Sequence, residues 1–436
     1  MRVGSAFLQT FTTQVLQSVA SILTGVLIAR ALGPTGQGFY AVFAAAIGLG
    51  VVAASVGQFE GNVLASASRE GAGRILLVRS IIQCILTGLI LVATIPLWTR
   101  AVPAAVRWMA PFFICVLALE VLAALIRGIN LGQHHIVAYN LTMMLQRFCY
   151  LVAVGGLAIA GLLSLKGIVV GWAVAVGISA SVGAVWIWSR SRSSAITWGD
   201  VFAGWSRALA GGLRPWTTII LSLILVRCDT WMLGPMLGVE AVGQMSVASS
   251  LAEYLWYIPS ILGNLLFARA AADRGPAVVQ TICRACRSLV VLLVPVVATL
   301  LLVGRRLVPL IYGEPFAVAG QVLIILLPGV TALALYLVVD SYFAGAGFPP
   351  ISILAVLGAL IVKISLNWLV VPSYGVLGAA GATSLAYGVL FLVKLVAFIR
   401  RTNASLADVL WPRSSDLREN LAVMRAWASS RSLVRP

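Results

Sequence analysis

The chain has 436 residues, of which 61% are hydrophobic and only 10% are charged. A soluble domain carries roughly 25% charged residues, so this composition excludes a water-soluble fold and places most of the surface in lipid. The formal net charge of +17 would suit nucleic acid binding. The arginines cluster between apolar runs, however, which is typical of the charges that orient a membrane protein. We therefore expect no nucleic acid partner.

The first apolar run, over about residues 6–29, is followed by Arg30 and not by a small-residue cleavage site, so we interpret it as a signal anchor and first span. A helix needs roughly 20 apolar residues to cross a bilayer, and about twelve segments reach that length. The expected spans, joined at Gly- and Pro-containing breaks, are residues 7–30, 39–59, 76–98, 109–127, 141–163, 168–188, 216–236, 241–265, 288–304, 320–340, 351–371 and 376–399.

The longest polar connection, residues 189–214, separates the predicted spans into two groups of six. We expect an all-α integral membrane protein with an N-terminal lobe (1–190), a cytoplasmic linker (191–214), a C-terminal lobe (215–400) and a basic cytoplasmic tail (401–436). Apolar residues recur every three or four positions in the tail, at Leu417, Leu421, Met424 and Trp427. This favours an amphipathic helix on the inner leaflet, and a disordered basic tail is the alternative.

Two segments match each other without a gap, residues 32–42 and residues 237–247. Both begin with Leu-Gly, and they share a further Gly and Val at equivalent positions. Each is a short break between long apolar runs. Related halves of this kind are typical of membrane transporters.

The distribution of Lys and Arg predicts the orientation of the chain. With the N-terminus in the cytoplasm, 20 of these residues fall in inner segments and 6 in outer segments. Cytoplasmic segments of membrane proteins are enriched in Lys and Arg. Both termini are therefore expected on the cytoplasmic side.

Four motifs resemble those of a known family. Residues 30–41 (RALGPTGQGFYA) look like the first outer loop of the polysaccharide exporters, and residues 229–243 are similar to the matching element of their second half. Residues 372–384 resemble their penultimate loop and last helix, and residues 310–313 (LIYG) also fit. These proteins are the lipid-linked oligosaccharide flippases of the multidrug/oligosaccharidyl-lipid/polysaccharide (MOP) exporter superfamily, which includes the MATE transporters.

The resemblance implies two pseudo-symmetric six-helix lobes around a central cavity that work by alternating access in the bacterial cytoplasmic (inner) membrane. It implies a substrate made of a polyprenyl pyrophosphate that carries an oligosaccharide, for surface polysaccharide synthesis, with an H⁺ or Na⁺ gradient as the driving force. A polysaccharide polymerase or a glycosyltransferase would be the protein partner. The peptidoglycan-precursor flippases of the superfamily have two further helices, for which this chain has no room.

A charge inside a bilayer is costly, so it usually faces protein or a water-filled cavity. We expect Arg147, Arg227 and Lys363 to bind the pyrophosphate, because they come from both lobes and because a pyrophosphate needs positive charge along its path. Arg30 would join them at the outer mouth. The alternative is internal ion pairing, for example of Arg227 with Glu253 on the next span.

Three basic residues also have interpretations that do not involve the substrate. Arg147 lies near enough to the inner face for its guanidinium to reach the interface. Lys394 and Arg127 are expected to be interface anchors.

A coupled exporter needs a group that binds an ion differently in its two states. The buried carboxylates Glu253 and Asp229 are the first candidates for this role, and Glu120 is the third. Arg127 lies seven residues after Glu120 on the same helix face, so these two would simply neutralise each other. Asp340 is placed at a helix end, where we expect it to be solvated.

Enzyme signatures are absent from the sequence. There is no Walker-type Gly-rich loop, and no Ser/His/Asp grouping stands out. The Cys283–Cys286 spacing would suit a metal, but no second pair or nearby His completes a site. We expect no enzymatic activity, cofactor or metal.

Two other functions remain open from the sequence. One is a drug or cation antiporter of the same fold, against which the first three spans lack an acid in their apolar runs. The other is a non-transporting membrane scaffold for a polysaccharide-assembly complex, with the tail as its partner surface.

Overall fold

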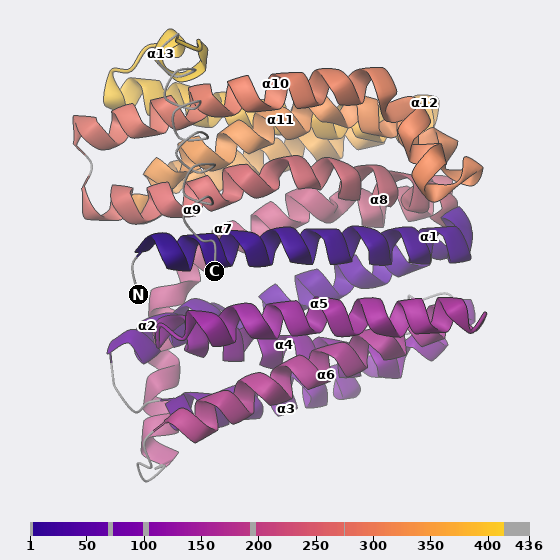
Figure 1. Ribbon diagram of the computed structural model, residues 1–436, viewed down its shortest axis with the longest axis vertical. Helices are drawn as coiled ribbons and strands as arrows, with labels where there is room; N and C mark the ends of the chain where they lie inside the picture. The colour runs from indigo at the N-terminus through magenta and orange to yellow at the C-terminus, as the bar shows by residue number, and fades with distance from the viewer. Residues whose placement is uncertain (1–2, 69–72, 99–103, 192–197, 274, 414–436) are drawn as a thin grey trace, which may run out of the picture. The chain divides into compact units, whose positions relative to one another are not determined.

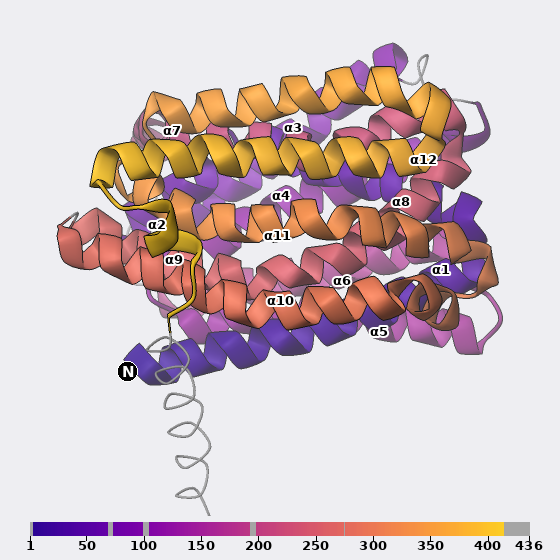
Figure 2. The ribbon, with the colours of Figure 1, turned by 90° about the horizontal axis from the view of Figure 1, so that it is seen from above.

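The computed structural model describes residues 3–68, 73–98, 104–191, 198–273 and 275–413 (Figure 1). Within these ranges the chain is helical and contains no strand. It packs as two compact units, residues 1–224 and 225–436. Figure 2 gives a second view of the same helices.

The first unit is a bundle of long apolar helices. Its elements are α1 (Val3–Ser55), α2 (Gln58–Ser68), α3 (Gly73–Trp98), η1 (Ala104–Met109), α4 (Ala110–Gly132), α5 (Ile136–Ile159), α6 (Leu165–Arg190) and the first part of α7 (Trp198–Leu237). Aliphatic side chains from α1, α4 and α6, among them Ile47, Val121 and Val169, form a common core. Large apolar side chains such as Val152 and Val185 remain exposed, as expected for a surface that faces lipid.

The second unit is built around one central helix. Its elements are the rest of α7, α8 (Val239–Glu253), η2 (Tyr254–Trp256), α9 (Tyr257–Ala272), α10 (Pro276–Tyr312), η3 (Glu314–Phe316), α11 (Ala317–Gly345), α12 (Pro350–Thr402) and α13 (Leu406–Leu410). The most apolar stretch of α11 is 67% buried, against 33% for that of α12 and 22% for that of α10. Helix α11 is therefore the core of this unit, and its neighbours separate it from lipid.

The helices agree with the twelve predicted spans. Nine helices of the described chain are long and apolar enough to cross a membrane, and two of them, α1 and α12, have 53 residues each. Each of these two is interrupted by a non-helical glycine and so provides two crossings. Helices α8 and α9, with 15 and 16 residues, are joined by η2 and together cover the predicted span 241–265. The predicted fold class, an all-α multi-pass membrane protein, is confirmed.

The internal repeat encodes a helix break. Gly33 has φ 65° and ψ −178°, and Gly238, its equivalent in the repeat, has φ 90° and ψ 167°. This region of backbone conformation is open essentially to glycine alone. A Cβ at either position would meet no atom within 4 Å, so the requirement for glycine comes from the backbone and not from crowding.

Parts of the predicted organisation are not tested by the structure. Helix α7 begins at Trp198, inside the predicted linker (residues 191–214), and its apolar part, Trp216–Leu237, agrees with the predicted span 216–236. The predicted amphipathic helix over residues 417–427 lies outside the described residues. The limits of the two lobes and the cytoplasmic position of both termini stay predictions.

Candidate functional site

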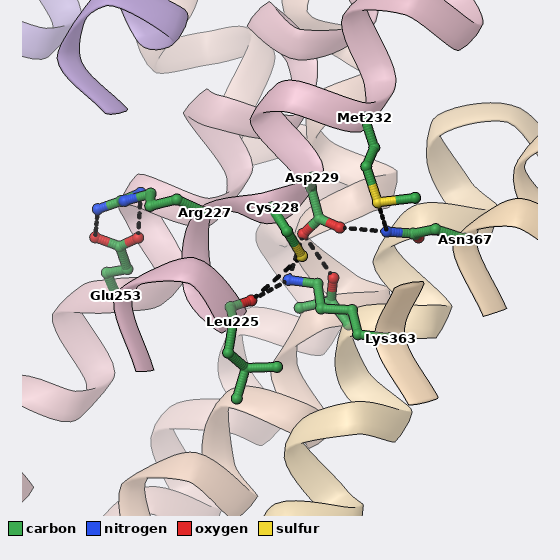
Figure 3. Close-up of polar contacts among 9 residues, drawn as sticks. Leu225, Arg227, Cys228, Asp229, Met232, Glu253, Lys363 and Asn367 are labelled. Carbon is green, nitrogen blue, oxygen red and sulfur yellow. Dashed lines mark hydrogen bonds and ion pairs between the residues drawn. The ribbon is translucent and has the colours of Figure 1, made fainter. Parts of the chain in front are cut away.

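A buried ion pair lies in the second unit. Lys363 Nζ on α12 is 2.6 Å from Asp229 Oδ2 on α7, and the two side chains are 0% and 5% exposed (Figure 3). The ammonium group also donates to the carbonyl oxygen of Leu225 at 2.8 Å. It lies 5.4 Å from the centre of the Tyr387 ring, a cation–π contact. Both charges are thus compensated in a place that water does not reach.

The Asp229 carboxylate connects three segments. Asn367 Nδ2 donates to Oδ1 at 2.8 Å, and Thr383 Oγ1 donates to Oδ2 at 2.8 Å. Lys363 and Asn367 are one helical turn apart before the break at Gly375, whereas Thr383 follows that break. Asp229 therefore holds α7 to both halves of α12. A carboxylate at this centre is placed to transmit a change in its own charge to all three segments.

A second ion pair lies on another side of α7. Arg227 Nη1 is 2.8 Å from Glu253 Oε1, and Nη2 donates to Oε2 at 3.1 Å, which is the two-bond fork geometry of Arg with a carboxylate (Figure 3). The Arg227 side chain is 33% exposed and that of Glu253 is 20% exposed. The alternative in which Arg227 pairs with Glu253 is confirmed. A guanidinium has five N–H donors, and the bonds to Glu253 use two of them.

Glu120, in the first unit, is held by several neighbours. Its Oε1 accepts from Trp172 Nε1 at 2.8 Å and from Gln146 Nε2 at 2.7 Å. Arg127 Nη2 lies 3.7 Å from Glu120 Oε2, and its Nη1 donates to Gln146 Oε1 at 2.9 Å. Neutralisation of Glu120 by Arg127, which the seven-residue spacing predicted, is confirmed. Arg127 is a partner in this network and not an interface anchor.

The other two predicted pyrophosphate ligands, Arg30 and Arg147, also lie in the first unit. Arg147 is exposed on α5, and Arg30 is exposed on α1, three residues before the break at Gly33. On the same two helices, the Tyr150 hydroxyl donates to the Tyr40 hydroxyl, 3.2 Å away. That Arg30, Arg147, Arg227 and Lys363 converge on one substrate stays a prediction.

Sequence reasoning missed a third ion pair in the second unit. Lys394 on α12 is 0% exposed and pairs with Asp340 on α11, and it donates to Ser352 Oγ at 2.7 Å. Its ammonium group lies 4.3 Å from the centre of the Phe343 ring. The predictions of Lys394 as an interface anchor and of Asp340 as a solvated residue are wrong, because packing of α11 against α12 brings both inside. The sequence feature that could have revealed this buried pair is Lys394 itself, because it is a charged residue with apolar neighbours on every side of its helix.

The burial of Arg79 was also not visible in the sequence, where this residue is one of the charges assigned to the inner face. It lies on the second turn of α3, is 2% exposed and donates to Asn62 Oδ1 on α2. Asn62 in turn donates to the carbonyl oxygen of Leu125 at 3.3 Å. Arg79 thus fastens α2 and α3 together inside the first unit.

No protein-family model matches the chain, and no curated protein matches it. Among solved structures, it is similar to the lipid II flippase MurJ in an inward closed conformation, with a TM-score of 0.69 and 12% identity over 90% of each chain. It is also similar to an inward-facing multidrug resistance MATE family transporter of the MOP superfamily, with a TM-score of 0.67 and 15% identity over 91% of this chain and 98% of that one.

A third match is a MOP superfamily transporter from Pyrococcus furiosus, described as having a binding pocket of reverse polarity that suggests a different function. Its TM-score is 0.62 at 18% identity, over 91% of this chain and 94% of that chain. The likeness covers nearly the whole chain in each case. The protein therefore has the fold of the MOP superfamily transporters.

Proposed function

We propose that the protein is a flippase that moves a polyprenyl-pyrophosphate-linked oligosaccharide across the bacterial cytoplasmic membrane by alternating access, with ion coupling. The observation that carries this proposal is the Arg227 guanidinium. It lies in a membrane-spanning helix, one third of its side chain is exposed, and its pair with Glu253 leaves further N–H donors. Such a group suits the pyrophosphate of a lipid-linked substrate.

Lys363 would act at a later step than Arg227. With 0% exposure, it contacts a pyrophosphate only after Asp229 has released it. Protonation of Asp229 would remove the negative charge that holds Lys363 and would weaken the link between α7 and the two halves of α12. In this proposal Asp229 is the ion-coupling group, and Glu253 and Glu120 are the other candidates. Arg147 and Arg30 would contact the substrate from the first unit.

The proposal is tested by translocation of a polyprenyl-pyrophosphate-linked oligosaccharide in proteoliposomes. We expect Arg227→Gln to lower the initial rate at least tenfold and Arg227→Lys to retain part of it, because lysine keeps the charge and loses the fork. The matched control is Arg305→Gln, which changes an exposed arginine near the C-terminal end of α10. A rate that is unchanged in Arg227→Gln would contradict the proposal.

A cation antiporter is the second candidate, and the similarity to MATE transporters favours it. The composition of α1 weighs against it, because this helix contains no Asp or Glu along its 53 residues. Efflux of a cationic dye that is abolished by Glu253→Gln would support the antiporter. Normal glycan export in Arg227→Ala and Glu253→Gln variants would instead support a scaffold.

A further inference from the structure

The span that carries Glu253 is interrupted near its middle. Helix α8 ends at Glu253, and the 3₁₀ turn η2 (Tyr254–Trp256) separates it from α9. Pro259 accounts for the break, because proline has no N–H to donate to the carbonyl oxygen of Leu255, four residues earlier, and its ring would clash with that oxygen in a continuous helix. Irregular backbone at membrane depth occurs beside protein or a water-filled space, and not where a helix faces lipid.

The side of the break that carries charge faces water. Arg227 and Glu253 are 33% and 20% exposed, although both lie in membrane-spanning segments of the second unit (Figure 3). Exposed charges at that depth are compatible with an aqueous surface and not with lipid. The aromatic residues that follow Glu253 therefore begin beside a hydrated surface, on which a polar ligand can bind.

Two tyrosines of the break form one aromatic surface. The rings of Tyr254 and Tyr257 are stacked, with their centres 5.4 Å apart and an angle of 23° between their planes. The 3₁₀ turn explains this arrangement, because residues three apart eclipse each other in a helix with three residues per turn. Both tyrosines are half-buried, and Tyr257 lies close enough to Arg227 to interact with it electrostatically. The two rings are therefore within reach of a ligand that contacts Arg227.

We propose that the stacked rings of Tyr254 and Tyr257, the tyrosine stack, bind a sugar ring of the transported lipid, next to the pyrophosphate at Arg227. This inference rests on the proposed function. A sugar ring has C–H groups on its faces, which pack against aromatic rings, and hydroxyl groups at its edge, which bond to carboxylate oxygens. The tyrosine stack supplies the aromatic face. Glu253 supplies the acceptor, because its two oxygens keep lone pairs beyond the bonds to Arg227.

An organic cation is the other kind of ligand that aromatic rings and a carboxylate attract. The Arg227 guanidinium weighs against it, because one of its nitrogens lies 2.8 Å from the Glu253 carboxylate and its charge repels a second cation there. A neutral sugar attached to a pyrophosphate meets no such repulsion. The arrangement therefore favours a glycan head group over a cationic drug.

The experiment measures the affinity of the purified full-length protein for two lipids, polyprenyl pyrophosphate and the same lipid carrying one glucose, by native mass spectrometry. Glucose is chosen because its ring hydrogens project from both faces. The test variant is Tyr254→Leu/Tyr257→Leu, which removes both rings, and Tyr254→Phe/Tyr257→Phe keeps them. The matched control is Tyr374→Leu, which changes a tyrosine of α12 that is 70% exposed.

The wild type should bind the glucose-carrying lipid about 3–10-fold more tightly than polyprenyl pyrophosphate, which is the gain expected from contact with aromatic rings. The Leu double variant should lose this difference and keep its affinity for polyprenyl pyrophosphate. The Phe double variant and Tyr374→Leu should retain the difference. Equal affinity of the wild type for the two lipids, or a Leu double variant that keeps the difference, would overturn this inference and leave the flippase proposal intact.

Further arms complete the test. If the Leu double variant does not fold, the single variants Tyr254→Leu and Tyr257→Leu should each lose part of the difference, and a full difference in both would overturn the inference. Ethidium that binds to the wild type and not to the Leu variants would assign the tyrosine stack to a cation and refute the sugar proposal. A folded wild type that binds neither lipid would contradict the flippase proposal itself, and this inference with it.

Discussion

The buried pair between Asp229 and Lys363 gives the sharpest prediction. Replacing Lys363 by Met leaves a carboxylate that is 5% exposed without its counter-ion. Breaking a buried ion pair from one side costs about 3–5 kcal/mol of stability. For a unit of this size, about 2–4 °C of melting temperature is lost per kcal/mol, so Lys363→Met should melt roughly 6–20 °C lower.

The companion variants separate the ion pair from general damage to the core. Asp229→Asn should also be strongly destabilised, because it leaves the ammonium group of Lys363 buried without a counter-ion. The double variant Asp229→Asn/Lys363→Met removes both charges and keeps an amide oxygen that accepts from Asn367 and an amide nitrogen that donates to the Thr383 hydroxyl. It should lie within about 1–2 kcal/mol of the wild type, since replacing a whole buried pair is often nearly neutral.

The assay is thermal unfolding of the four purified proteins in one detergent, followed by tryptophan fluorescence and analysed as a double-mutant cycle. We expect a coupling energy of several kcal/mol, on the order of the cost of one single change. A double variant whose melting temperature falls by the sum of the two single shifts would refute the claim that the charges compensate each other.

Two further predictions use the same preparations. Gly33→Ala should lose about 1–3 kcal/mol because alanine rarely adopts a positive φ, whereas Gly25→Ala, at a helical position with open space beside it, should be neutral or stabilising in the same melting assay. Lys394→Met should lose about 3–5 kcal/mol, and a melting temperature equal to that of the wild type would show that its pair with Asp340 does not form.

Local features of the sequence predicted a large part of this structure. The apolar runs located the spans because each run is close to the length of one bilayer crossing. The repeated Leu-Gly located the breaks at Gly33 and Gly238 because only glycine has access to that backbone conformation. Pairing of Glu120 with Arg127 was visible because residues seven apart lie on one face of a helix.

Contacts between distant segments were not visible in the same way. Asp229 and Lys363 lie 134 positions apart, and nothing in either segment shows which face of α12 meets α7. Lys394 and Asp340 are on neighbouring helices, but their pairing depends on how α11 and α12 are rotated against each other. Single-sequence periodicity gives no such rotation for helices that are apolar on all sides.

The packing of α13 against α10 shows a different limit. Arg287 on α10 donates to the carbonyl oxygen of Asp408 on α13, 121 positions away. In the sequence Arg287 contributes only to the count of inner charges. For α7 the sequence predicted the apolar part, now Trp216–Leu237, but not that the helix itself begins earlier, at Trp198.

Direct measurement of translocation tests the central proposal most sharply. Wild-type protein, Arg227→Gln and the control Arg305→Gln are reconstituted in parallel with a polyprenyl-pyrophosphate-linked oligosaccharide, and the amount that reaches the opposite leaflet is followed over time. A flippase should move the lipid in the wild type and the control and should be at least tenfold slower in Arg227→Gln. No movement of the lipid by the folded wild type, or equal rates in all three proteins, would contradict the proposal that the protein is a flippase.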